Sequence, residues 1–176
     1  FRIAVSELAG GRIGIGSLGL GLGLQAIETA TRYALERKQF DQSISNFQAI
    51  QWKIADATTE LEAARLLLMN AAFRKEQGRS YAKEASMAKL FASEAANRAC
   101  YEAMQIFGGY GYMEEYKIAR MFRDARIGTI GGGTSEIMRE IIAKMVIDDK
   151  SYQPAEKAQD KSENLAEVQN ETANEN

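Results

Sequence analysis

The sequence contains no histidine, one cysteine (Cys100) and one proline (Pro154) among its 176 residues. Without histidine the chain lacks the commonest general base and the commonest metal ligand, so the usual hydrolase triads and zinc sites are disfavoured and we expect no metal. One cysteine excludes a disulfide framework within the chain, and we interpret Cys100, which is set among apolar residues, as a core residue. Because proline is absent before residue 154, nothing in residues 1–150 forbids long helices.

The chain also lacks a dominant charge and a long apolar run. It has 22 Lys and Arg against 24 Asp and Glu, a net charge of -2, so we expect no nucleic-acid partner held by electrostatics. The apolar run over residues 13–24 is shorter than the ~20 residues that a spanning helix needs, so we expect no transmembrane segment. With 45% hydrophobic residues, the composition is typical of a soluble globular domain.

Helical periodicity dominates the first 150 residues, whereas alternating strand patterns are scarce. Apolar residues recur at steps of three and four over residues 47–68, and alanines do so over residues 85–103, which is one stripe along a helix in each case. We predict helices over about residues 2–36, 46–77, 80–107 and 134–148, with a shorter one near 115–124. Short connections between them favour an all-α fold, an antiparallel four-helix bundle over residues 1–150. Residues 151–176 are polar, and we predict a disordered tail.

The segment "GIGSLG" contains a G-x-G-x-x-G pattern at Gly14, Gly16 and Gly19. That fingerprint binds a dinucleotide only where it follows a strand, and the residues before it are typical of a helix. We therefore interpret these glycines as small residues on a helix packing face, with Gly10 and Gly14, and then Gly19 and Gly23, four residues apart. Glycine inside a helix costs ~1 kcal/mol relative to alanine, so close helix packing must compensate.

Three short segments carry groups suited to binding an anion or a flat ring. "YALERKQF" ends a helix with Arg37 and an aromatic residue, Phe40, and "QIFGGYGYMEEY" places three glycines among aromatic residues. "GGGTSEIM" sets three glycines before a helix start, where Thr134 or Ser135 is the expected cap. Exposed backbone N–H groups at such turns bind anions or carbonyl oxygens. An ordinary cap or connector is the alternative for each segment.

These segments together resemble the C-terminal helical domain of the acyl-CoA dehydrogenase family. Seven motifs occur in the family's order over about residues 1–148: "GRIGIGSLGLG", "YALERKQF", "FQAIQWKIAD", "MAKLFASEAA", "QIFGGYGYMEEY", "RMFRDARI" and "GTSEIM". The resemblance implies an FAD-dependent oxidation of acyl-CoA thioesters at the α,β bond, with electrons passed to an electron-transfer flavoprotein. It also implies a homo-oligomer (a dimer or tetramer), two further domains before this one, and a place in the bacterial cytoplasm or the mitochondrial matrix.

The resemblance further implies roles for individual residues. Arg12 matches an arginine that contacts the CoA portion, and Gly133 matches a glycine that contacts the acyl-CoA. Arg37 matches an arginine on the FAD of a neighbouring subunit, and residues 105–109 match a backbone segment at the adenosine end of FAD. The residues implied to bind the cofactor are Arg37, Phe40, Gln48, Gln105, Ile106, Phe107, Gly108, Gly109, Thr134, Ser135 and Glu136.

The sequence departs from the family at the catalytic base. Many members carry a glutamate directly before "GTSE", where this chain has Gly132, and some branches carry it directly before the arginine that matches Arg12, where this chain has Gly11. Glu7, four residues before Gly11, is a weak candidate, so the catalytic residue is not identified. Three interpretations stay open. The base comes from Glu7 or from other domains; the chemistry is a flavin-dependent elimination without α-proton abstraction; or the chain is a homologue without a base that serves acyl-CoA binding or oligomerisation.

Overall fold

The computed structural model describes residues 2–149, with side chains from Leu8 onward. The predicted tail of residues 151–176 lies outside the described residues. The elements are the helices α1 (Arg2–Glu36), α2 (Gln48–Glu76), α3 (Ala82–Phe107), α4 (Gly109–Tyr112), α5 (Lys117–Ala125) and α6 (Ser135–Asp148), with the short strands β1 (Lys38–Gln39) and β2 (Gln42–Ser43). Two 3-10 turns, η1 (Ile44–Asn46) and η2 (Arg126–Thr129), complete the order. The five predicted helices are present, and their ends agree within about two residues.

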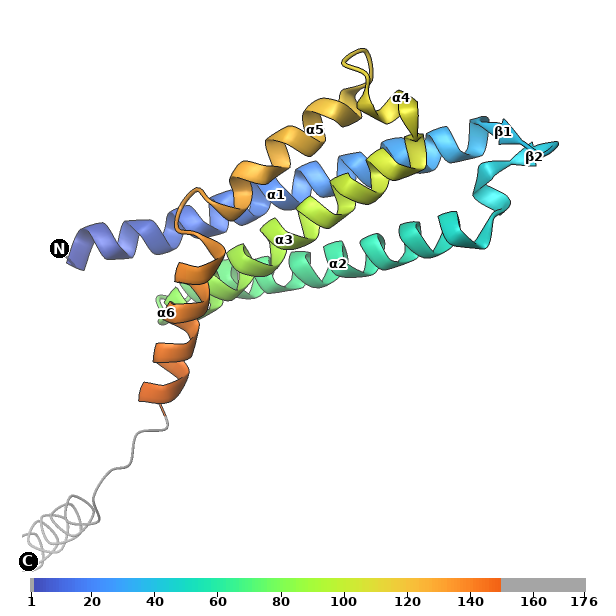
Figure 1. The fold of residues 1–176 in the computed structure, drawn as a ribbon. Coiled ribbons are helices and arrows are strands. Elements are labelled where there is room, and N and C mark those ends of the chain that lie inside the picture. The colour runs from blue at the N-terminus through green and yellow to red at the C-terminus, as the bar shows by residue number, and fades with distance from the viewer. Residues whose placement is uncertain (1, 150–176) are drawn as a thin grey trace, which may run out of the picture. The chain divides into compact units, whose positions relative to one another are not determined.

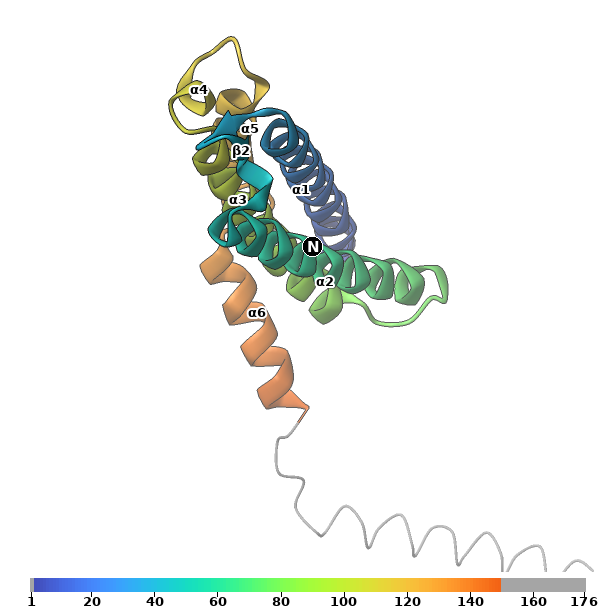
Figure 2. The same ribbon diagram turned by 90° about the vertical axis from the view of Figure 1, so that its right-hand side faces the viewer.

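Helices α1, α2 and α3 lie side by side, and each runs antiparallel to the one before it in the chain (Figures 1 and 2). This confirms the predicted all-α bundle. The short helix α5 packs against α3 and α1. Residues 1–143 form one compact unit, which includes the first turns of α6 with the fully buried Met138. The end of α6, from Lys144, belongs to a second unit.

Small residues let α1 and α3 approach closely. Seven alanines of α3 are at most 1% exposed: Ala85, Ala88, Ala92, Ala95, Ala96, Ala99 and Ala103. A Cβ atom at Gly23 of α1 would lie 2.6 Å from Leu61 Cδ2 and 3.3 Å from Ala96 Cα, and one at Gly16 would lie 3.4 Å from Lys89 Cα. The close packing therefore requires glycine at these positions.

The packing face of α1 differs in part from the predicted one. Gly16, Gly19 and Gly23 face α3, whereas a Cβ atom at Gly14 would meet nothing within 4 Å. The prediction for Gly14 was wrong because residue 14 lies two positions from residue 16, about 200° around the helix. Steps of three and four from Gly16 identify the packed face correctly.

The prediction that no segment is long and apolar enough to span a membrane is also wrong. By length and composition alone, residues Leu8–Glu36 could cross a membrane, with a mean hydropathy of 1.2 over an 18-residue window. Apolar residues continue beyond Arg12 and Gln25, which bound residues 13–24. A core helix passes the same test, and α1 packs along α3 and α2. We therefore interpret α1 as a bundle helix.

A tight hairpin connects α1 to α2. Lys38 pairs with Ser43 and Gln39 with Gln42, which leaves Phe40 and Asp41 as the two turn residues, at φ 51° and 61°. Two-residue hairpin turns favour such positive φ values, but glycine or asparagine usually occupies them. The backbone of Phe40 is therefore strained, and strained backbone is more often found at binding sites than elsewhere.

Candidate functional site

The end of α1 and the end of α3 form one cavity of about 650 Å³. Arg37 lies there with its guanidinium carbon 5.7 Å from the centre of the Tyr110 ring, and Tyr33 stacks on Phe107 with ring centres 4.1 Å apart. Gly108 has φ 61° and caps α3. The residues that line the cavity are Tyr33, Arg37, Gln39, Ile44, Ile106, Phe107, Gly108, Gly109, Tyr110 and Met113. Segments about 70 residues apart in the sequence thus contribute a cation, aromatic rings and open backbone to one place.

Three other predicted residues do not line this cavity. Gln48, the first residue of α2, and Gln105 are exposed, and Phe40 is 86% exposed in the hairpin turn. Ile106 and Phe107 are buried in the core, so what they present to a ligand is their backbone. The glycines are open, since a Cβ atom at Gly108 or Gly109 would meet nothing within 4 Å.

The loop of residues 131–135 leads into α6. Gly132 and Gly133 have φ values of 70° and 104°, which side chains rarely adopt. The Thr134 hydroxyl accepts a hydrogen bond from the Ile137 N–H at 3.4 Å, so Thr134, one of the two expected caps, lies at the cap position. Ser135 is buried and its hydroxyl has no hydrogen-bond partner among the described residues.

Glu136 follows on the exposed side of the same helix start. Its pKa lies below the ordinary value of 4.5, because the carboxylate accepts hydrogen bonds from its own backbone N–H and from Thr134, with further help from Arg139 and Arg126. A depressed pKa keeps the carboxylate ionised and makes it a poor proton acceptor. A hollow of about 370 Å³ here is lined by Glu94, Arg126, Thr129, Ile130, Thr134, Ser135, Glu136 and Arg139.

Two buried cations lie between α1 and α3, close to the loop. Arg12 is 9% exposed; its Nη1 donates to Ser86 Oγ at 3.4 Å, and its Nε has no partner among the described residues. Lys89 is 0% exposed, and its Nζ donates to the Gly133 carbonyl at 2.6 Å. Burial lowers the pKa of both groups, and the charge of Arg12 lowers that of Lys89 further.

Lys89 was not among the residues predicted from the sequence. Its position was nevertheless visible, because Lys89 lies four residues after Ala85 and three before Ala92, on the buried alanine stripe of α3. A lysine on such a stripe is buried or distorts the helix contact. The partner, Gly133, could not be foreseen from helix periodicity.

An apolar hollow of about 790 Å³ lies between α1 and residues 124–131. Ile15, Leu18 and Leu22 line it with five glycines, and Asp124 is the carboxylate among its lining residues. The others are Gly14, Ser17, Gly19, Gly21, Gln25, Ala125, Ile127, Gly128 and Gly131. A Cβ atom at Gly132 would overlap Ile15 Cδ1, whereas one at Gly11 would meet nothing within 4 Å. The Glu7 side chain lies outside the described residues.

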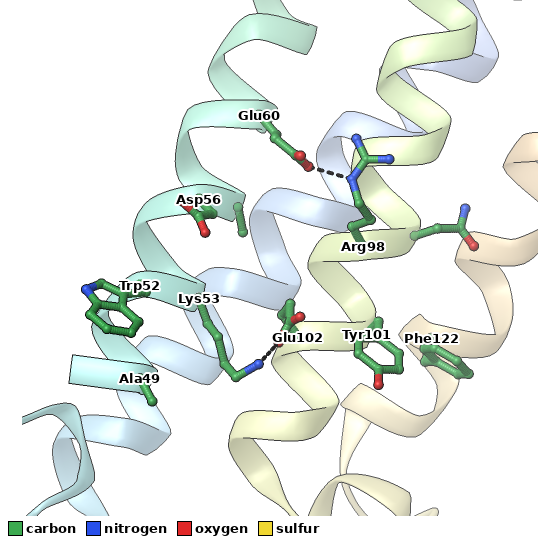
Figure 3. A pocket seen from close by; sticks show the side chains of 11 residues that line it. Ala49, Trp52, Lys53, Asp56, Glu60, Arg98, Tyr101, Glu102 and Phe122 are labelled. Atoms are coloured by element: carbon green, nitrogen blue, oxygen red, sulfur yellow. Dashed lines mark hydrogen bonds and ion pairs between the residues drawn. The ribbon is translucent and has the colours of Figure 1, made fainter. Parts of the chain in front are cut away.

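A further hollow, of about 670 Å³, lies between α2, α3 and α5 (Figure 3). Trp52, Tyr101 and Phe122 lie along it, with the Lys53–Glu102 and Arg98–Glu60 ion pairs between α2 and α3. None of the residues predicted to bind a ligand lines this hollow. The candidate site therefore consists of the Arg37 cavity and of the loop with its buried cations.

Comparisons with known proteins agree with these features. Residues 1–147 match the family described as "Acyl-CoA dehydrogenase, C-terminal domain". The chain is 50% identical over 147 residues to a probable acyl-CoA dehydrogenase, YngJ, of Bacillus subtilis, covering 84% of this chain and 39% of that protein. It is 48% identical over 147 residues, with the same coverage, to the caffeyl-CoA reductase-Etf complex subunit CarC of Acetobacterium woodii. Among solved structures, butyryl-CoA dehydrogenase from Megasphaera elsdenii superposes with a TM-score of 0.83 at 42% identity, over 84% of this chain and 38% of that one. The chain thus spans about two fifths of the length of these proteins.

Proposed function

We propose that this chain, which belongs to the acyl-CoA dehydrogenase family, forms the C-terminal helical part of an FAD-dependent oxidoreductase. The proposed reaction is the oxidation of the α,β carbon–carbon bond of an acyl-CoA thioester, with electrons passed to an electron-transfer flavoprotein. The observation that carries the proposal is the cavity in which Arg37 meets Gly108 and Gly109. The relative named as a subunit of a reductase–Etf complex supports an electron-transfer flavoprotein as partner.

The residues of the chain fit FAD at two places. Arg37 would pair with a phosphate, and the open backbone at Gly108 and Gly109 lets a ligand approach the main chain. At the other place, the unpartnered Ser135 hydroxyl and the start of α6 offer donors to a polar ring edge. Bound FAD supplies a two-electron acceptor, and the role of the chain is to bind and orient it.

The two places are too far apart for one FAD molecule bound to one copy of the chain. The loop that leads to Ser135 packs beside Ile15 of α1, and Arg37 directly follows the end of the same helix. The 22 residues from Ile15 to Arg37, at 1.5 Å each, span about 33 Å. An extended dinucleotide is shorter than this. We therefore propose that Arg37 and residues 105–109 serve the cofactor of a second copy, within a homodimer or tetramer.

The substrate residues lie at the loop. Arg12 would contact the CoA portion, and Gly133 would contact the thioester through its backbone. The apolar hollow beside the loop, lined by Ile15, Leu18 and Leu22, suits an acyl chain, because apolar surface leaves water there. Placed in this way, the chain would exclude water from the thioester and hold its carbonyl.

A second candidate function follows from the missing base. Neither Gly132 nor Gly11 has a carboxylate, and Glu136 has a depressed pKa. A positioned base typically contributes 10²–10⁴-fold to a rate. The alternative is thus a homologue that binds acyl-CoA or assembles without dehydrogenating it, or that catalyses an elimination without α-proton abstraction.

Anaerobic absorbance spectroscopy of the native holoprotein separates these functions. We would add a panel of acyl-CoAs to the oxidised flavoprotein and, because one relative is named as a reductase, a panel of enoyl-CoAs to the reduced flavoprotein. Bleaching or reoxidation at ordinary enzymatic rates supports the dehydrogenase. A protein that binds acyl-CoA while its flavin stays oxidised would contradict dehydrogenation and support the second candidate.

A further inference from the structure

Lys89 is a fully buried cation whose hydrogen-bond partner is a neutral group. Lysine is almost never fully buried unless it is paired with an opposite charge, yet Lys89 is 0% exposed and donates to the backbone carbonyl of Gly133. Among the described residues no carboxylate forms an ion pair with Lys89. The charges of Glu94 and Glu136 raise its pKa without direct contact, and Arg12 is a second buried positive charge nearby. A methionine would fill the same volume without the desolvation cost. The lysine is therefore poorly explained by stability.

The partner of Lys89 lies in a segment with few anchors of its own. Gly131, Gly132 and Gly133 have no side chains, and the last two have positive φ values. Backbone hydrogen bonds fix the edges of the loop, from the Gly131 N–H to the Ile127 carbonyl and from the Met138 N–H to the Thr134 carbonyl. Between these edges, the Lys89 ammonium donates the hydrogen bond that connects the loop to α3. It joins positions 44 residues apart in the sequence.

The hydrogen bond also determines the direction of a backbone donor. The peptide group between Gly133 and Thr134 is planar and trans, so its C=O and N–H point in opposite directions. Because the carbonyl points at Lys89, the Thr134 N–H points away from α3. Loss of the ammonium would free this peptide to rotate, since glycine at position 133 resists rotation least.

We propose that Lys89 is a positioning residue for the loop of residues 131–135, holding the Gly133 carbonyl so that the adjacent N–H and the glycine backbone face the ligand. The proposal rests on the proposed function in one respect, namely that this loop borders the thioester and the flavin. It assigns Lys89 no contact with either ligand. It predicts that Lys89 matters for the rate more than for folding or substrate affinity.

The test compares Lys89→Met and Lys89→Arg with the control Ser93→Ala in the native holoprotein. Ser93 is also fully buried on α3, but its hydroxyl donates to the Leu90 carbonyl of its own helix. For Lys89→Met we expect an unchanged or raised melting temperature, and flavin reduction by acyl-CoA about a hundredfold slower with KM changed little. Lys89→Arg, which keeps a charged donor, should recover part of the rate, and Ser93→Ala should behave as the wild type. A lowered melting temperature with an unchanged rate for Lys89→Met would overturn the proposal.

A second measurement does not depend on the reaction. Hydrogen exchange of the Gly131 and Met138 amides reports the edges of the loop, and it should become faster in Lys89→Met and stay unchanged in Ser93→Ala. Unchanged exchange at both amides in Lys89→Met would overturn the proposal. If no acyl-CoA reduces the wild-type flavin, the proposed function fails, while the exchange measurement still decides whether Lys89 holds the loop.

Discussion

Glutamate substitutions at Gly11 and Gly132, the two positions where the resemblance to the family implies a base, should differ in their cost to stability. Gly11 lies inside α1, and a Cβ atom there meets nothing within 4 Å among the described residues. Replacing a helix-interior glycine removes backbone freedom from the unfolded chain, so Gly11→Glu should stabilise by about 0.5–1 kcal/mol. At Gly132, a side chain at φ 70° costs about 1–2 kcal/mol, and displacing Ile15 adds about 1–3 kcal/mol. For a chain of this size, these values correspond to a melting temperature raised by about 2 °C and lowered by roughly 5 to 15 °C, respectively.

The assay for the restored base is exchange of the substrate α-proton with D₂O, followed by NMR in the native holoprotein. Gly11→Gln has the same shape without the carboxylate and serves as the control. A positioned base contributes 10²–10⁴-fold, so exchange with Gly11→Glu should exceed that with Gly11→Gln by about 100-fold or more. Gly132→Glu should give a smaller gain together with its loss of stability. A Gly132→Glu variant as stable as the wild type would refute the loop geometry, and equal exchange in Gly11→Glu and Gly11→Gln would refute the idea that Gly11 marks a base position.

Three further outcomes follow from the packing and the buried groups. Gly23→Ala should destabilise the protein by about 1–3 kcal/mol in urea unfolding, because its Cβ would lie 2.6 Å from Leu61 Cδ2. Gly21→Ala should stabilise it by up to about 1 kcal/mol, because a Cβ atom there meets nothing within 4 Å among the described residues. Equal effects would contradict the assigned helix faces. Burial raises the pKa of Cys100 to about 12, so a thiol reagent at pH 8 should label it only after unfolding, and rapid native labelling would show that it is accessible. The pKa of Lys89 lies below its ordinary 10.5 in the folded state, so the unfolded chain binds more protons between the two pKa values and the free energy of unfolding rises with pH there. The stability gained in Lys89→Met should therefore be largest below this pH range and smallest above pH 10.5. A gain independent of pH would refute the buried charge.

The helices could be predicted from the sequence because the spacing of apolar residues along the chain marks the face that each helix buries. The alternation of three and four in residues 47–68 defines the buried stripe of α2, which contains Ala57, Leu61, Ala64 and Leu68. The resemblance to the family also predicted that Arg37 and residues 105–109 belong to one site, and the structure brings Arg37 together with Ile106–Gly109 in one cavity. Their binding of FAD remains a prediction.

Other features could not be predicted, because they depend on contacts between distant segments. The Lys89 hydrogen bond joins α3 to a loop 44 residues away, and no periodicity relates the two. The residue at the N-cap of α3 is Tyr81, which makes no side-chain cap hydrogen bond, although Ser80, a residue type that favours caps, directly precedes it. Thr134 was one of two possible caps, and its hydroxyl accepts the cap hydrogen bond from the Ile137 N–H, whereas Ser135 is the buried first residue of α6. Local preference thus determined which elements form, and packing determined which side chains meet.

The glycines of α1 divide into two sets with different physical justifications. Gly10, Gly16, Gly19 and Gly23 pack against neighbouring groups, and the contacts at Gly16 and Gly23 are too close for a Cβ atom. Gly11, Gly14 and Gly21 meet nothing within residues 8–149 that a Cβ would touch. Each glycine of the second set costs ~1 kcal/mol relative to alanine, and packing within residues 8–149 does not offset this cost. Gly14 and Gly21 line the apolar hollow beside Gly131, where the proposed function places the acyl chain. Gly21→Ala should therefore raise the melting temperature and weaken acyl-CoA binding together; a variant that gains stability and keeps its affinity would show that this face does not hold the substrate.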